Sequence, residues 1–92
     1  MTNFSIPNAF TPNGDGNNDE FKAIIANDLV AIKSFRIYNR WGQNVFHTNK
    51  RNFGWNGRFN GKKCEGGTYF YLLEVPIGNE SFDYKGDLTL LR

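Results

Sequence analysis

Asparagine and glycine together make up a quarter of this 92-residue chain, and their abundance constrains the fold more than any other feature. Glycine adopts positive φ angles without strain, and the asparagine amide bonds nearby backbone groups, so both favour turns. Both are also poor helix formers. So many turn residues in a chain of one-domain length predict a single domain, residues 1–92, with many short strands, and exclude a helical bundle.

Apolar and polar residues alternate in several short runs between these turns. Residues 35–39 and 44–47 predict a hairpin around a glycine-containing loop, residues 69–75 resemble a central strand that is apolar on both faces, and residues 82–90 alternate most regularly. We therefore predict an all-β sandwich or small barrel of about six or seven short strands. The predicted core consists of Phe35, Ile37, Tyr69, Tyr71, Leu73, Leu88 and Leu90.

One local pattern favours the sandwich, specifically an immunoglobulin-like antiparallel β-sandwich. Glu65, Gly67 and Tyr69 have the acid-x-Gly-x-Tyr spacing of the corner before strand F in immunoglobulin domains, where the tyrosine hydroxyl bonds nearby backbone. Tyr71 then occupies the position at which such domains place a cysteine. Cys64 is the only cysteine, so no intramolecular disulfide is expected.

No residue pattern predicts catalysis or a cofactor. His47 is the only histidine and lies on an outer hairpin strand, Cys64 has no second cysteine beside it, and the glycines follow no phosphate-binding pattern. The sequence therefore indicates a protein that is not an enzyme. It also has no apolar run long enough for a membrane-spanning helix and no visible signal peptide at its start.

A polar loop precedes the second predicted strand. Asp15, Asn17 and Asp19 have the oxygen-ligand spacing that opens a calcium loop, but the later ligand positions of an EF-hand are absent. The alternative is a turn in which these side chains bond their own backbone. The sequence favours this structural turn, and we predict no metal site.

The charges are distributed in three blocks: acidic, basic and acidic. The middle block holds eight basic residues and no acid: Lys33, Arg36, Arg40, Lys50, Arg51, Arg58, Lys62 and Lys63. The favoured interpretation is that folding brings the opposite charges together, and the alternative is a basic face that recognises an acidic partner. Nucleic-acid binding through Trp41, Phe53, Trp55 and Phe59 is disfavoured, because the flanking acids dilute the basic block.

Five stretches in a fixed order resemble one known family. They are residues 7–21, 35–42, 55–57, 67–71 and 84–92. Together they resemble the gliding-motility-associated C-terminal domain of Bacteroidetes, the type B sorting domain of the type IX secretion system. The family's motif loop corresponds here to Asn13, Asp15, Gly16, Asn18 and Asp19. Two departures are that residues 63–65 intervene before the Gly-Thr-Tyr strand and that Asn56 replaces an acid.

The resemblance implies a non-catalytic C-terminal sorting signal attached to an N-terminal cargo. The cargo would be exported through the periplasm to the outer-membrane surface or secreted. The implied partner is the type IX secretion machinery, through a PorP/SprF-family outer-membrane protein, and the implied fold is an immunoglobulin-like sandwich. The alternative function is a stand-alone carbohydrate- or surface-ligand-binding sandwich that would stack sugars on Trp41, Trp55 and tyrosines.

Candidate partner-recognition residues lie in the basic block: Lys33, Arg36, Arg40, Trp41, Gly42, Lys62 and Lys63. Arginine and tryptophan are enriched in interface hot spots, and Arg40 and Trp41 are expected at a hairpin turn. Against this, burial would stabilise the indole ring. We therefore expect Trp41 to fold back over the end of the sandwich, with Arg40 paired to a carboxylate of residues 15–20.

Overall fold

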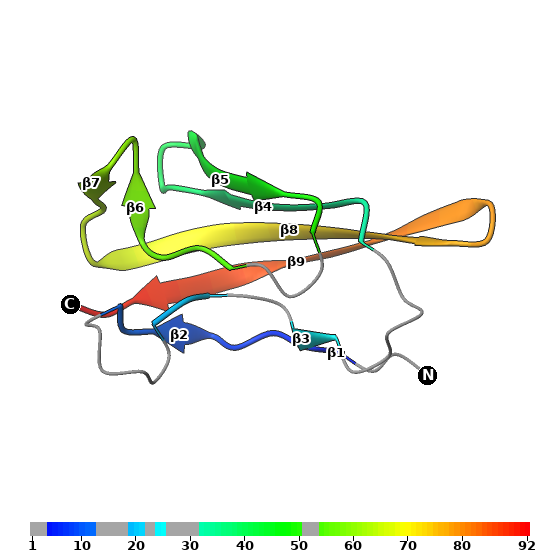
Figure 1. Ribbon diagram of the computed structural model, residues 1–92, viewed down its shortest axis with the longest axis horizontal. Helices are drawn as coiled ribbons and strands as arrows, with labels where there is room; N and C mark the ends of the chain where they lie inside the picture. Colours follow the sequence, from blue (N-terminus) through cyan, green and yellow to red (C-terminus); the bar gives the residue numbers. More distant parts are fainter. Residues whose placement is uncertain (1–3, 13–18, 22–23, 26–31, 51–53) are drawn as a thin grey trace.

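The computed structural model describes residues 4–12, 19–21, 24–25, 32–50 and 54–92 (Figure 1). These residues form strands and turns, with no helix among them. The strands are β1 (Phe4–Ser5), β2 (Ala9–Phe10), β3 (Ile24–Ile25), β4 (Ser34–Tyr38), β5 (Asn44–Thr48), β6 (Arg58–Phe59), β7 (Lys62–Lys63), β8 (Gly67–Ile77) and β9 (Glu80–Leu90).

The main sheet has five strands in the order β2-β9-β8-β4-β5. Its centre is the long hairpin of β8 and β9, whose register runs from Gly67 opposite Leu90 to Ile77 opposite Glu80. β4 pairs with β8 and with β5 in antiparallel fashion, and the β4–β5 pairing confirms the predicted hairpin. β2, however, pairs with β9 in parallel, so the sheet is mixed. A tight turn makes two strands antiparallel only when they are adjacent in sequence, whereas β2 and β9 lie near opposite ends of the chain and can pair in either direction.

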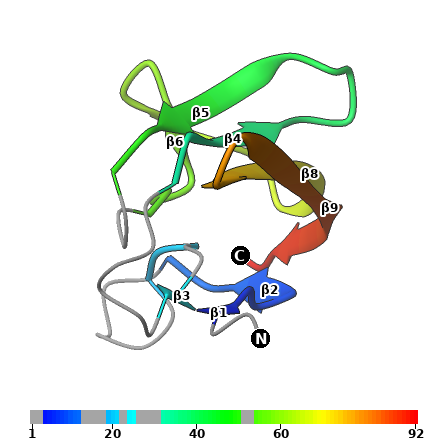
Figure 2. The ribbon, with the colours of Figure 1, turned by 90° about the vertical axis from the view of Figure 1, so that its right-hand side faces the viewer.

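Two layers enclose the core. In the view of Figure 2 the main sheet curves from β5 through β9 to β2, and the short pair β1–β3 lies beside β2, across from β4 and β8. The two views agree that β1 and β3 form the second layer, beside the β2 edge of the main sheet (Figures 1 and 2). This arrangement confirms the predicted small all-β sandwich.

The core contains six of the seven predicted residues, and Tyr71 packs against it half-buried. Sequence alternation missed Phe10, Phe21 and Trp55, which are fully buried. Phe21 and Trp55 form an isolated antiparallel bridge outside the named strands, and the ring centroids of Phe10 and Trp55 are 5.5 Å apart. A period-2 pattern identifies core residues only within strands of several residues, so it does not detect residues in very short strands or isolated bridges.

Candidate recognition surface at the β4–β5 turn

The turn between β4 and β5 is fixed by the side chain of Asn39. Its Oδ1 atom accepts hydrogen bonds from the backbone N–H of Trp41 at 3.0 Å and of Gln43 at 2.9 Å. The backbone N–H of Gly42 also donates to the Asn39 carbonyl oxygen at 3.0 Å. Gly42 has a φ of 81°, in the left-handed region that favours glycine. The sequence analysis did not single out Asn39, although an asparagine two residues before a predicted turn residue is a recognisable signal.

This turn holds Trp41 in solvent, with 82% of the residue exposed. The expectation that Trp41 covers the end of the sandwich is therefore wrong. The Asn39 hydrogen bonds direct the turn outward, and Val45 and Tyr69, rather than Trp41, are buried at this end of the core. The indole ring instead lies beside the Arg40 guanidinium, whose Cζ atom is 5.7 Å from the ring centroid.

Arg40 pairs with a carboxylate that the sequence analysis did not name. Its Nη2 atom lies 3.6 Å from Oε2 of Glu65, in the loop after β7. The expected pairing with residues 15–20 stays a prediction, because Asp15 lies outside the described residues. Both side chains are mostly exposed, so this ion pair contributes about 0–1 kcal/mol to stability. The pair connects the β4–β5 turn to the segment before β8, and both charged groups remain accessible to solvent.

A groove of about 350 Å³ lies between this turn and the β6–β7 hairpin. Its lining is Asn39, Arg40, Trp41, Gln43, Val45, Phe59, Lys63, Cys64, Glu65 and Tyr69. The structure thus brings Arg40, Trp41 and Lys63 together, with the exposed Gly42 and Lys62 beside them in sequence. We call these five residues (Arg40, Trp41, Gly42, Lys62 and Lys63) the turn end.

The floor of the groove confirms the predicted tyrosine corner. The Tyr69 hydroxyl donates a hydrogen bond to the backbone carbonyl oxygen of Glu65 at 2.7 Å, four residues earlier. Burial raises the pKa of the Tyr69 hydroxyl, with a further contribution from Cys64. Burial also raises the pKa of the Cys64 thiol, against smaller lowering effects of Tyr69 and Arg92. A thiol with a raised pKa is a poor nucleophile at neutral pH.

The other wall of the groove is tied to the end of β9 by Arg92. Its Nε atom donates to the Cys64 carbonyl oxygen at 2.7 Å, and its Nη2 atom donates to the Gly57 carbonyl oxygen at 2.9 Å. These two carbonyls flank the β6–β7 hairpin, and the Cys64 N–H also donates to the Gly57 oxygen at 2.8 Å. One guanidinium therefore closes the base of the hairpin that carries Lys62 and Lys63.

Lys33 and Arg36 do not join the turn end. Lys33 precedes β4 at the opposite end of that strand, and Arg36 lies at its middle on the outer face. Both contribute to a lowered pKa of Glu74, whose main cause is a hydrogen bond from the Ser34 hydroxyl at 2.6 Å. The seven predicted recognition residues thus divide between two places. Opposite charges do meet at Glu74, as the favoured interpretation expects.

Several expected sites are tested only in part. Within the motif loop, Asn13, Asp15, Gly16 and Asn18 lie outside the described residues, whereas Asp19 is half-buried. Among the residues that the structure describes, no cluster of histidine, cysteine, aspartate and glutamate could hold a metal ion. His47 is exposed on the outer strand β5, as expected.

An aromatic residue that both binding hypotheses require is buried in the core. Trp55, which both the nucleic-acid and the carbohydrate hypotheses use, is only 1% exposed. Phe53 lies outside the described residues. In the described part of the chain, no helix is long and apolar enough to cross a membrane.

Comparison with known proteins gives one result. Residues 4–90 match the sequence profile of the CHU_C type IX secretion signal domain. No match was found among curated proteins. The match covers nearly the whole chain and the same stretches on which the resemblance to sorting domains rests. The chain therefore belongs to the family of type IX secretion signal domains.

Proposed function

We propose that this signal domain is carried at the C-terminus of a larger cargo protein and is recognised through its turn end. The observation that carries the proposal is the exposure of Trp41, an indole held in solvent by a hydrogen-bonded turn. Family membership supports export across the outer membrane by the type IX machinery. A PorP/SprF-family outer-membrane protein is the proposed partner, and the cell surface or the medium is the proposed destination.

The chemistry of the turn end suits a protein partner with acidic groups. Tryptophan and arginine provide the largest contributions in many interfaces, and here Arg40 already lies beside the indole ring. Lys63 lines the same groove, so a carboxylate that enters it would meet Lys63 and would compete with Glu65 for Arg40. A secretion signal domain is typically non-catalytic, and we propose that this one has no enzymatic activity.

The function is tested by export of a reporter. The reporter is placed behind a Sec signal peptide and in front of this chain, in a host that has a type IX system. We expect the reporter at the cell surface or in the medium, and in the periplasm of a host lacking that system. Export of the reporter without the domain would refute the sorting function.

The surface is tested by charge reversals with a matched control. Arg40→Glu, followed by Lys62→Glu with Lys63→Glu, should reduce export about tenfold or more, because like charges across an interface are strongly unfavourable. Lys33→Glu is the control, because Lys33 precedes β4 at the end of that strand away from the turn. Equal export by these variants, the control and the unaltered chain would refute recognition through the turn end while leaving the sorting function intact.

A further inference from the structure

The outer face of the main sheet carries apolar side chains that are exposed or half-buried. Along β8, Tyr69, Tyr71 and Leu73 point into the core, and the residues between them, Phe70 and Leu72, point away from it. Phe70 is 45% exposed although it lies in the middle of the sheet. Single exposed apolar residues are common, but a cluster on a sheet face indicates an interaction surface.

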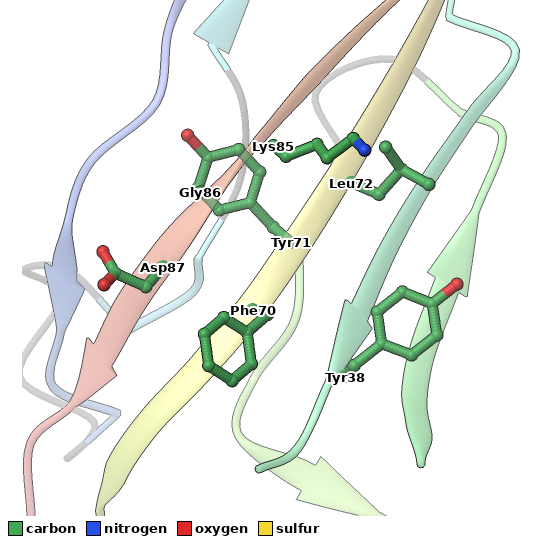
Figure 3. A pocket seen from close by; sticks show the side chains of 7 residues that line it. All are labelled: Tyr38, Phe70, Tyr71, Leu72, Lys85, Gly86 and Asp87. Atoms are coloured by element: carbon green, nitrogen blue, oxygen red, sulfur yellow. The ribbon is translucent and has the colours of Figure 1, made fainter. Parts of the chain in front are cut away.

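This face is hollowed. An open pocket of about 590 Å³ is lined by Tyr38, Phe70, Tyr71, Leu72, Lys85, Gly86 and Asp87. Figure 3 shows the Phe70, Leu72 and Tyr38 side chains along β8 and β4, with Asp87 and Lys85 on the neighbouring β9. A second hollow of about 300 Å³ adjoins it at Tyr38 and is lined also by Arg36, Asn44 and His47. The depression therefore extends across four strands.

The strand register arranges these side chains in two rows that run across the sheet. Phe70 on β8 lies opposite Asp87 on β9 and opposite Tyr38 on β4, which gives an acidic–aromatic–aromatic row. Two residues further along β8, Leu72 lies opposite Lys85 and opposite Arg36, which gives a basic–apolar–basic row. On β9 the second row has a cation where the first has a carboxylate, and on β4 it has a cation where the first has an aromatic ring.

We propose that the two rows form a self-complementary surface on which a second copy of this chain docks. A two-fold axis that lies between the rows, parallel to them, places each row of one copy over the other row of its partner. Asp87 then faces the second copy's Lys85, and Phe70 faces its Leu72. Tyr38 faces the guanidinium of the second copy's Arg36, an arrangement that favours a cation–π contact.

Other symmetric arrangements are less favourable. An axis that runs along either row places Asp87 over Asp87 or Lys85 over Lys85, with like charges in contact. An axis parallel to the rows but beyond the basic row, on the side away from Phe70, places Leu72 over the carboxylate of Glu74. Among these axes parallel to the rows, the one between them combines opposite charges with apolar contact, and it stacks the two sheets in an aligned packing.

The proposal is tested with the 92-residue chain by sedimentation velocity between about 0.01 and 1 mM, the range suited to a small, weak interface. We expect a reversible dimer. Lys85→Glu and Asp87→Lys should each raise the dissociation constant about tenfold or more, because each places like charges together. Mixing these two variants should restore association, because the acidic chain then faces the basic chain at both positions.

An aromatic pair on the β8–β9 hairpin supplies a control. Phe70→Ser should abolish the dimer, whereas Phe82→Ser should leave it intact, since Phe82 is 43% exposed but lies outside both rows. Circular dichroism must show unchanged folding for each variant. A chain that stays monomeric at 1 mM, or a mixture that fails to associate, overturns the proposal. A monomeric chain whose export is lost with Phe70→Ser instead assigns the face to a protein of the export machinery.

Discussion

The protein contains two tryptophan turns that look alike in sequence and differ completely in structure. Trp41 is followed by Gly42, and Trp55 is followed after one residue by Gly57. The two glycines have nearly the same φ, 81° and 82°. Yet Trp41 is 82% exposed and Trp55 is 1% exposed. A glycine with a left-handed φ follows both tryptophans, so this local feature does not explain the difference, which comes from what the rest of the chain places around each turn.

The neighbourhood of Trp55 is crowded. Its backbone N–H and C=O bond those of Phe21 at 2.9 and 2.8 Å, and its indole N–H donates to the Arg58 carbonyl oxygen at 2.9 Å. A Cβ atom on Gly57 would lie 3.1 Å from Pro12 and from Arg92, whereas one on Gly42 would meet nothing within 4 Å. Trp55 is thus part of the core, and Trp41 is free to contact a partner.

The largest expected effect is that of Trp55→Ala. Removing a fully buried aromatic side chain costs about 3–5 kcal/mol, a large part of the roughly 5–14 kcal/mol expected for a domain of this size. Urea unfolding followed by circular dichroism measures the loss. A free energy of unfolding within about 1 kcal/mol of that of the unaltered chain would contradict the structural role assigned to Trp55.

Tyr69 connects the two regions, and Tyr69→Phe sharpens the comparison. The ring of Tyr69 packs edge-on against Trp55 with centroids 5.1 Å apart, while the residue also lines the groove beside Trp41. The substitution keeps the ring and removes only the hydroxyl that bonds the Glu65 carbonyl oxygen. We expect a loss of about 1 kcal/mol in the free energy of unfolding, measured in the same way. No loss would show that the corner hydrogen bond does not stabilise the fold.

A smaller effect on stability is expected from alkaline pH, through the ionisation of Cys64 and Tyr69, which line the groove beside Trp41. The pKa values of the Cys64 thiol and the Tyr69 hydroxyl are raised from 9.0 and 10.0, chiefly by burial. The folded state therefore holds these protons more tightly than the unfolded state, so the added stability is present below pH 9.0 and lost as pH rises through the folded pKa values. Urea unfolding from pH 8 upward should show this loss, and Cys64→Ser should reduce it. An equal decline in the variant would exclude the thiol as a cause.

The smallest effect on stability is expected from Trp41→Ala. An exposed side chain away from the core changes the free energy of unfolding by no more than about 0.5 kcal/mol. Export of a reporter fusion should nevertheless fall, because the exposed indole is the proposed contact. A large loss of stability would show that Trp41 packs against the domain, and unchanged export would remove it from the proposed recognition surface.

Features that depend on neighbours along the chain follow from the amino-acid sequence alone. The β4–β5 and β8–β9 hairpins follow from alternating residues around glycine-containing turns. The Tyr69 hydrogen bond follows from an acid-x-Gly-x-Tyr spacing whose two partners are four residues apart. Membership of the secretion signal family was also evident from five short motifs in a fixed order. In the hairpins and the tyrosine corner, the interacting groups are separated by a short or tightly turned segment, so residue spacing predicts the contact.

Features that depend on distant segments appear only in the three-dimensional structure. The parallel pairing of β2 with β9 and the bridge between Phe21 and Trp55 join residues far apart in the chain. The sequence also did not show that Arg36 and Arg40 lie in different surroundings. Arg36 lies on the outer face of β4, whereas Arg40 lies in the following turn and lines the groove. Burial depends on which side chains fill the space around a residue, and the pattern around Trp41 and Trp55 alone does not contain that information.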